Sequence, residues 1–311
     1  MKRIFCTGGA GFIGSNLVKA LSDKGFSVTV FDDLSLGKLS NLEGNYTFHK
    51  GSILDFGLLK EKMTGHDTVV HLAALPRINP SILEPIPAHD VNLTGTLHVL
   101  EAARQNGVEQ VIYAGSSSIF GKEATVPMKE DDPKKPQSPY AYQKLASEGY
   151  CHLYSRLYGL NSAILRFFNV FGDKMPTTGS YAVVAGIFRE QKAQGLPLTI
   201  KGDGNQKRDF TWVGDICQGI ISAIEKRSVG VYHLGTGTQV SINELAEAID
   251  PGGKREYMEA SKGDYPETMA DITRAREVLG YEPTVNVLQW LKENEPQSDT
   301  LPDNVKVVLS N

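Results

Sequence analysis

Short apolar runs alternate with segments of helical periodicity over the first half of the chain, and no other feature limits the fold as strongly. The runs are RIFCT, SVTVFDD, YTFHKGS, DTVVHLAA and QVIYAGSS, with helices expected from Phe12 to about Lys24 and near Val91–Gln105. Strands separated by helices pair in parallel, and right-handed crossovers place the helices on both faces. We therefore expect an α/β fold with a doubly wound parallel (Rossmann) sheet, which NSAILRFFNV and SVGVYHLG extend.

Two later stretches differ in composition from this alternating part. Residues 173–209 and 236–292 are richer in Gly, Pro and charged residues. We expect them to form a smaller α/β lobe over the carboxyl ends of the strands, where open α/β sheets bind ligands. The expected division is a larger domain of residues 1–172 plus about 210–238, a lobe of about 173–209 plus 239–292, and a polar, loosely ordered tail at 293–311.

The overall composition excludes several classes of protein. A formal net charge of −4 argues against a nucleic-acid surface, and no segment approaches the roughly 18 apolar residues of a membrane span. The three cysteines are far apart and have no metal-ligand spacing, which favours a reducing compartment and no metal site. Glycines interrupt the apolar run near the N-terminus, so it does not resemble a signal peptide. We expect a cytoplasmic protein with no nucleic-acid or membrane partner.

Three glycines stand between the first predicted strand and the first predicted helix. TGGAGFIG places Gly8, Gly11 and Gly14 in that turn. Such a loop lets backbone amides approach a pyrophosphate at a helix N-terminus, although turns also use glycine for structural reasons. Asp32 ends the second strand, where a carboxylate binds the adenosine ribose hydroxyls and repels a 2′-phosphate. This context predicts a dinucleotide, with NAD favoured over NADP.

A tyrosine stands four residues before a lysine twice in the chain. Tyr46 and Lys50 lie in a predicted strand, where side chains at this spacing stand roughly 13 Å apart. Tyr140 and Lys144 lie in a predicted helix, where they are neighbours at about 5–6 Å. An ammonium that close favours a tyrosinate and lowers the pKa of the phenol, although two exposed residues on an amphipathic helix have the same spacing. Only the second pair is a candidate general base.

A run of serines ends the predicted strand before Tyr140. YAGSSSIFG delivers Ser116, Ser117 and Ser118 to the carboxyl edge of the sheet. The hydroxyl of Ser116 is placed either to hydrogen-bond the substrate oxygen that Tyr140 deprotonates or to form an ordinary serine-rich turn. The catalytic interpretation is favoured because a nucleotide loop and a helical Tyr-Lys pair accompany it.

The chain carries, in order from Lys2 to about Trp290, the motifs TGGAGFIG, VVHLAA, SSSIFG, PYAYQK, LRFFNVFG, KGDGNQKRDFTWVGD and HLGTG. This ordered set resembles the extended short-chain dehydrogenases/reductases, and within them the nucleotide-sugar epimerases typified by UDP-glucose 4-epimerase. The resemblance implies that Ser116, Tyr140 and Lys144 form a catalytic triad, with NAD as cofactor and a UDP-sugar as substrate. It also implies a homodimer in which helices near Val91–Gln105 and Ala141–Tyr158 form a four-helix bundle.

The resemblance further implies which residues bind each ligand. The cofactor is expected to contact Gly8, Gly11, Phe12, Ile13, Gly14, Asp32, Asp33, Lys38, Ser52, Ile53, Leu72, Ala73, Ala74, Asn92, Tyr140 and Lys144. The sugar nucleotide is expected to contact Ser117, Ser118, Asn169, Arg208, Lys262 and Thr268. Asp215 also falls in a motif that lines the sugar-nucleotide site.

Some positions depart from the pattern of the family. Ser52 stands where relatives often have an acid beside the adenine. Ser261 replaces an arginine that commonly contacts the diphosphate, and the adjacent Lys262 either substitutes for it or leaves nucleotide affinity weaker. Thr268 falls where relatives place a size gate beside the C2 substituent of the sugar, and a small residue there admits N-acetyl groups.

The residues after Ser116 separate the reaction types of the family. Dehydratases and decarboxylases typically carry acids there, whereas Ser117 and Ser118 are not general acids near pH 7. We therefore expect C4 epimerisation of UDP-glucose/UDP-galactose, and also of UDP-GlcNAc/UDP-GalNAc, through a transient 4-keto sugar. The alternatives are a dehydratase, a UDP-glucuronate epimerase, which requires a basic pocket, and a non-catalytic NAD-binding regulator.

Overall fold

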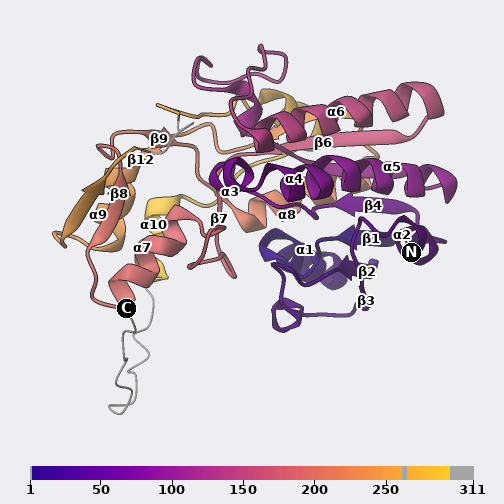
Figure 1. The fold of residues 1–311 in the computed structure, drawn as a ribbon, viewed down its shortest axis with the longest axis horizontal. Helices are drawn as coiled ribbons and strands as arrows, with labels where there is room; N and C mark the ends of the chain where they lie inside the picture. The colour runs from indigo at the N-terminus through magenta and orange to yellow at the C-terminus, as the bar shows by residue number, and fades with distance from the viewer. Residues whose placement is uncertain (1, 261–264, 295–311) are drawn as a thin grey trace.

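A seven-stranded parallel sheet forms the centre of the structure (Figure 1). The computed structural model describes residues 2–260 and 265–294, so Lys262 and the tail from residue 295 lie outside the described range. Across the sheet the strands follow the order β11 (Gly230–Leu234), β6 (Asn161–Phe167), β5 (Gln110–Ser116), β4 (Thr68–His71), β1 (Arg3–Thr7), β2 (Ser27–Asp32) and β3 (Thr47–Lys50). The expected doubly wound α/β fold is confirmed.

The strand order changes direction at β1. The chain adds β2 and β3 on one side of β1 and then crosses over to add β4, β5, β6 and β11 on the other side. Cys6 of β1 is therefore paired with Val30 of β2 and with Val70 of β4. A sheet of this kind opens a crevice at the carboxyl ends of its strands, next to the point where the order reverses, and ligands bind there.

Helices cover both faces of the sheet. One face packs against α1 (Phe12–Asp23) and α8 (Val213–Glu225), and the other packs against α2 (Phe56–Met63), α5 (Gly95–Gln105) and α6 (Pro139–Tyr158). Along β5, Val111 joins the core under α5 and α6, whereas Ile112 joins the core under α8. This alternation arises because successive side chains of a strand point to opposite faces.

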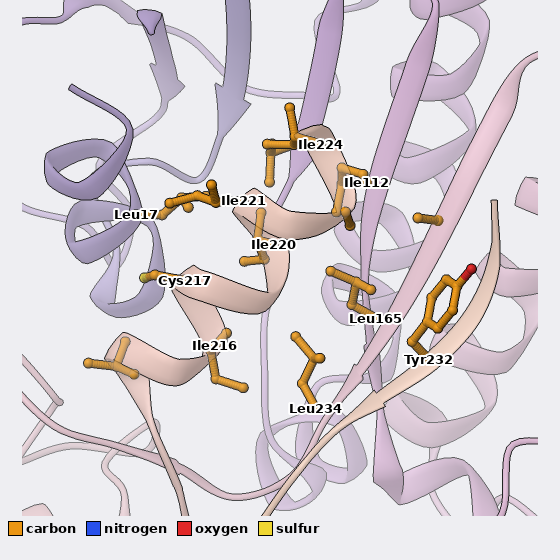
Figure 2. Packing of buried hydrophobic residues seen from close by; sticks show 14 of the residues in the cluster. Leu17, Ile112, Leu165, Ile216, Cys217, Ile220, Ile221, Ile224, Tyr232 and Leu234 are labelled. Atoms are coloured by element: carbon orange, nitrogen blue, oxygen red, sulfur yellow. The ribbon is translucent and has the colours of Figure 1, made fainter. Parts of the chain in front are cut away.

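Helix α8 lies beside α1 on the same face of the sheet. Its sequence, VGDICQGIISAIE, is apolar over most of its circumference, as expected for a helix with neighbours on several sides. Figure 2 shows Ile221 beside Leu17 of α1, with Ile112 and Leu165 of the sheet on its other side. The helix is therefore fixed in place by the core, and the loop before it is fixed with it.

The segments after β6 build a third hydrophobic cluster at one side of the sheet (Figure 1). They comprise β7 (Val170–Phe171), α7 (Val184–Ala193), β8 (Leu198–Lys201), β9 (Lys207–Arg208), β10 (Thr211–Trp212), β12 (Val240–Ser241), α9 (Ile242–Ile249), β13 (Arg255–Met258) and α10 (Val287–Glu293). Phe188, Leu198 and Leu245 are fully buried in this cluster. The exact division of the chain into domains stays a prediction.

The connection from β4 to α5 is more helical than the sequence suggested. It contains α3 (Ile78–Leu83), α4 (Pro85–His89) and a π-helical turn at Asp90–Thr94 that runs directly into α5. Pro85 occupies the first turn of α4, where a proline loses no helical hydrogen bond. In the part of the chain that the structure describes, no helix is long and apolar enough to cross a membrane.

Candidate active site

A large cavity runs along the carboxyl ends of the parallel strands. Its volume is about 1260 Å³, more than the roughly 300–1,000 Å³ of a pocket for one small molecule. The loops after β1, β2, β4, β5 and β6 supply one wall, and residues 174–188 with parts of β8 and β9 supply the other. The cavity therefore lies where the strand topology predicts a ligand site.

The loop between β1 and α1 lines part of this cavity. Gly8 has a φ of +70°, and a Cβ added to it would lie 2.6 Å from the backbone nitrogen of Ala73. A Cβ on Gly14 would collide with the carbonyl oxygen of Gly8. Both positions therefore require glycine. The amides of Gly8, Ala10 and Gly11 donate within the protein, so it is the amides in the first turn of α1 that are left for a pyrophosphate. This cradle fits a dinucleotide.

Asp32 ends β2 and also lines the cavity. Its carboxylate oxygens accept hydrogen bonds from the backbone amides of Ala10 at 2.9 Å and Leu34 at 2.8 Å. Burial raises the pKa of Asp32, and these two hydrogen bonds partly oppose the rise. Each oxygen keeps a free lone pair for a ribose hydroxyl, whereas a 2′-phosphate would meet a carboxylate. The acceptor positions of this carboxylate therefore fit the ribose hydroxyls of NAD.

Most other residues expected at the cofactor also line the cavity. These are Gly11, Phe12, Ile13, Asp33, Lys38, Ser52, Ile53, Leu72, Ala73 and Ala74. Asn92 is an exception because it is buried behind the wall. Its side chain accepts a hydrogen bond from the amide of Leu75 at 2.8 Å and donates one to the carbonyl of Leu75 at 3.0 Å. Asn92 therefore fixes the loop after β4 instead of facing the cavity.

Ser116, Tyr140 and Lys144 line the same cavity. Ser116 is the last residue of β5, and the other two lie one turn apart near the start of α6. The Nζ of Lys144 donates a hydrogen bond to the carbonyl oxygen of Ala114 at 2.9 Å and lies 5.9 Å from the centre of the Tyr140 ring. The structure thus brings together the three side chains that the sequence singled out for catalysis.

The electrostatics of Tyr140 differ from the sequence-based expectation. Burial raises the pKa of its phenol above the ordinary value, while the hydroxyl of Ser116 and the charge of Arg77 partly oppose the rise. Burial also lowers the pKa of Lys144 to about 8. The net lowering of the Tyr140 pKa that the sequence predicted is not found, and Lys144 is not among the causes of the shift. Arg77, which sequence analysis missed, is the cation that favours the phenolate.

The other Tyr-Lys pair does not reach this site. Tyr46 immediately precedes β3 and Lys50 ends it. Tyr46 is 36% exposed, and neither residue is among the described residues that line the cavity. The helical pair is therefore the one that the fold brings to the candidate site.

Five of the expected sugar-nucleotide contacts line the cavity. They are Ser117, Ser118, Asn169, Arg208 and Thr268. The amide nitrogen of Asn169 donates to the hydroxyl of Thr268 at 3.3 Å, which ties β7 to the segment that carries the expected size gate. Arg208 donates to the carbonyl of Lys207 at 2.8 Å. Lys262 lies outside the described residues.

Asp215 stabilises the fold and is not among the described residues that line the cavity. It lies in the first turn of α8, and its carboxylate accepts hydrogen bonds from the backbone amide of Thr284 at 3.0 Å and from its hydroxyl at 2.8 Å. Burial raises the pKa of Asp215, and these hydrogen bonds partly oppose the rise. The residue anchors the segment before α10, while the motif that contains it reaches the cavity through Arg208.

Three cations of the cavity, Arg77, Lys174 and Lys201, were missed from the sequence. Arg77 precedes α3, and Lys174 follows β7. The Nζ of Lys174 pairs with Glu43 at 2.7 Å. An arginine in a proline-containing loop is usually a solvated surface residue, so LPRINPS alone did not identify Arg77 as a site residue.

The doubly wound sheet, the glycine cradle and the buried acid after β2 define a dinucleotide-binding α/β protein. The sequence pattern of the NAD dependent epimerase/dehydratase family matches residues 4–235. The chain therefore belongs to this family, and NAD is its cofactor. The extended short-chain dehydrogenase/reductase resemblance drawn from the motifs is confirmed.

Known relatives cover almost the whole chain. The UDP-glucose 4-epimerase of Mycolicibacterium smegmatis is 37% identical over 303 residues, covering 93% of this chain and 96% of that protein. The UDP-glucuronate 4-epimerase of Thermodesulfobacterium geofontis is 33% identical over 315 residues, covering 93% and 95%. A solved structure of the UDP-N-acetylglucosamine 4-epimerase from Methanobrevibacter ruminantium, in complex with UDP-N-acetylmuramic acid, matches with a TM-score of 0.89 at 34% identity, covering 94% and 96%.

Proposed function

We propose that the protein epimerises a UDP-hexose at C4 through a transient 4-keto sugar. One observation carries this proposal: Ser116, Tyr140 and Lys144 line one cavity with the glycine cradle of the dinucleotide. A phenol, a serine hydroxyl and a buried ammonium beside a redox cofactor suit the oxidation of an alcohol. Relatives named as UDP-sugar 4-epimerases support the substrate class and the position of the reaction.

Each of the three catalytic residues then has its own role in the reaction at C4. Tyr140, as phenolate, takes the proton of the C4 hydroxyl and returns it to the keto oxygen from the same atom. Ser116 hydrogen-bonds the same sugar oxygen and orients it. Lys144 donates to the carbonyl of Ala114 and would hold the nicotinamide ribose of the bound cofactor. NAD, when bound, supplies the acceptor and donor of the C4 hydride, so the reaction has no net redox change.

The rest of the cavity binds the remaining parts of the substrate. Arg208 carries a guanidinium fork suited to the diphosphate of a nucleotide sugar. Thr268 is a small side chain at the wall, and we propose that it leaves room for an N-acetyl group at C2 of the sugar. The proposed substrates are UDP-glucose and UDP-galactose together with their N-acetylated counterparts.

The alternatives differ in what they require of the same residues. A dehydratase needs an acid beside Ser116, where Ser117 and Ser118 stand. A non-catalytic NAD-binding regulator has no use for a phenol, a serine and a buried lysine in one cavity. A UDP-glucuronate epimerase needs a cation that binds the carboxylate of the sugar, and Arg77 is the residue of the cavity to test for that role.

The experiment is to incubate the NAD-loaded protein with UDP-glucose, UDP-galactose, UDP-GlcNAc and UDP-glucuronate and to resolve the products by proton NMR. The proposal expects interconversion at C4 with no net formation of NADH. Release of water or carbon dioxide from the sugar would identify a dehydratase or a decarboxylase. The absence of turnover on every sugar would favour the regulator.

A further inference from the structure

Arg77 occupies a strained position in the wall of the cavity. It lies between β4 and α3, and its backbone has φ 93° and ψ 143°. Residues other than glycine rarely adopt a positive φ, because the Cβ clashes with the backbone, and such strain persists mainly where function requires it. Lys174 of the same cavity also has a positive φ of 63°, so the strain at Arg77 becomes informative only together with the state of its charge.

The charge of Arg77 has no counterion in the described part of the protein. Its Nε donates a hydrogen bond to the carbonyl oxygen of Tyr181 at 3.3 Å, and no described carboxylate forms an ion pair with it. Lys174, in the same cavity, is neutralised by Glu43 at 2.7 Å. A half-buried guanidinium without an anion is unfavourable unless a ligand supplies one.

Arg77 is also coupled to the reacting end of the site. The phenol of Tyr140 and the guanidinium interact electrostatically in this cavity. Both residues line the cavity, and α3, which begins directly after Arg77, packs against α6, where the hydroxyl of Ser81 accepts a hydrogen bond from the amide of Tyr140 at 3.0 Å. An anion bound by Arg77 would therefore lie near the sugar carbon that reacts at Tyr140.

The positions of the substituents on a nucleotide sugar limit which anionic group of the substrate Arg77 can bind. In a hexopyranose, C4 lies across the ring from C1, which carries the diphosphate. The substituents nearest to C4 are those on C3 and C5. A substrate anion close to both Tyr140 and Arg77 is therefore carried by the sugar itself, on one of these two carbons, and is not the diphosphate at C1.

We propose that Arg77 binds a carboxylate on the sugar next to C4, so that the site favours an acidic UDP-sugar over its neutral counterpart. This inference rests on the proposed function, because it takes C4 to lie at Tyr140. A planar guanidinium binds a carboxylate through two parallel hydrogen bonds. The carboxylate is either C6 of a hexuronate or the lactyl acid at C3 of a muramic acid, the group present in the ligand of the M. ruminantium relative.

The test measures charge preference as a ratio. Dissociation constants and kcat/KM are determined for UDP-glucuronate against UDP-glucose, and for UDP-N-acetylmuramate against UDP-N-acetylglucosamine, with NAD-loaded protein. Arg77→Gly removes the charge and adopts φ 93° without strain, so folding is not at risk. Arg77→Lys keeps the charge without the fork. Lys174→Met is the matched control, because it removes a cavity cation that already has a partner.

We expect the wild type to bind one acidic sugar roughly tenfold to a hundredfold more tightly than its neutral counterpart. Arg77→Gly should abolish this preference, Arg77→Lys should reduce it, and Lys174→Met should retain it. The pair of sugars that shows the preference identifies which carbon carries the acid. An equal ratio in wild type and Arg77→Gly overturns the proposal.

Two further outcomes separate the possible failures. If Arg77 only favours the phenolate, Arg77→Gly lowers kcat equally for acidic and neutral sugars and shifts the pH profile of kcat upward, which also overturns the proposal. If no sugar is epimerised but the ratio of dissociation constants still depends on Arg77, the proposed function fails while the carboxylate site stands.

Discussion

The backbone amide of Tyr140 donates a hydrogen bond to the hydroxyl of Ser81, which ties the first turn of α6 to α3. Ser81 is 1% exposed and also donates to the carbonyl of Ile78 at 2.7 Å. Ser81→Ala leaves the amide of Tyr140 without this partner, so we expect a loss of about 1 kcal/mol in unfolding free energy and roughly a tenfold drop in kcat.

A matched control separates positioning from stability in this experiment. Ser241 caps α9 with a comparable hydrogen bond, its hydroxyl accepting from the amide of Glu244 at 3.1 Å, and it does not line the cavity. Ser241→Ala should cost a similar free energy of unfolding while kcat changes much less. Equal losses of kcat in the two variants would refute the positioning role of Ser81.

Replacing the proposed base tests the catalytic assignment directly. Tyr140→Phe removes the hydroxyl that exchanges a proton with the sugar, and we expect kcat to fall by at least about 10²-fold while NAD stays bound. The control is Tyr46→Phe, since that tyrosine stands outside the cavity at the same spacing from a lysine. Similar losses of turnover in both variants would contradict the assignment.

Lys144 gives a prediction about stability and pH. Its pKa is lowered to about 8 from the ordinary 10.5, so between these values the unfolded chain binds the proton and the folded chain does not. Because the unfolded state binds more protons there, the stability of the fold rises with pH from about 8 to about 10.5. Below pH 8 both states are protonated, and the penalty for burying the charge is at its full size.

The measurement compares the wild type with Lys144→Met, both freed of NAD, by denaturant unfolding between pH 7 and pH 10. The unfolding free energy of the wild type relative to the variant should increase across this range by roughly 2–3 kcal/mol. The control is Lys24→Met, which removes an exposed lysine directly after α1 and so accounts for the loss of a lysine side chain as such. A flat difference for Lys144→Met would mean that its ammonium is not penalised by burial.

These results show which parts of the site local sequence can predict. The cradle at Gly8 and Gly14 was predictable because a strand, a glycine-rich turn and a helix are contiguous in the chain. Tyr140 and Lys144 were predictable because helical periodicity sets their separation. In each case the chemistry depends on neighbours in sequence.

The parts that were missed depend on contacts between distant segments. Asp215 lies in a motif of the site, but the partner that uses both its oxygens is Thr284, far along the chain. The pKa of Tyr140 depends on Arg77, on its own burial and on Ser116, whereas Lys144 lies at the carbonyl of Ala114. Neither relationship follows from residue spacing.

The structure identifies exposed apolar side chains that are available for the interface of the predicted homodimer. In α6, one of the helices expected at the dimer interface, Tyr154 is 7% exposed and donates its hydroxyl to Glu101 at 3.1 Å, whereas Leu157 at 58% and Tyr158 at 54% are exposed. A second exposed apolar group consists of Leu83 at 81%, Ile86 at 73% and Tyr142 at 65%. They lie on α3, α4 and the start of α6, helices that contact one another.

We expect burial of this apolar surface to hold two copies of the chain together. Leu83→Glu combined with Ile86→Lys should shift the mass measured by light scattering at micromolar concentration from dimer to monomer. Leu196→Glu, at a 50% exposed leucine after α7, is the control and should leave the mass unchanged. A monomeric wild type would refute the dimer.

Thr268 carries the prediction about the C2 substituent of the sugar. It lines the cavity with 4% of its surface exposed, and its hydroxyl accepts a hydrogen bond from Asn169 at 3.3 Å. Thr268→Tyr adds a ring at this wall and should abolish epimerisation of UDP-GlcNAc while UDP-glucose is still converted, because a pocket rejects an oversized group sharply. Thr268→Ser keeps the hydroxyl and the open space, so it should retain both activities. Epimerisation of UDP-glucose without any on UDP-GlcNAc in the wild type would show that other residues set the C2 specificity.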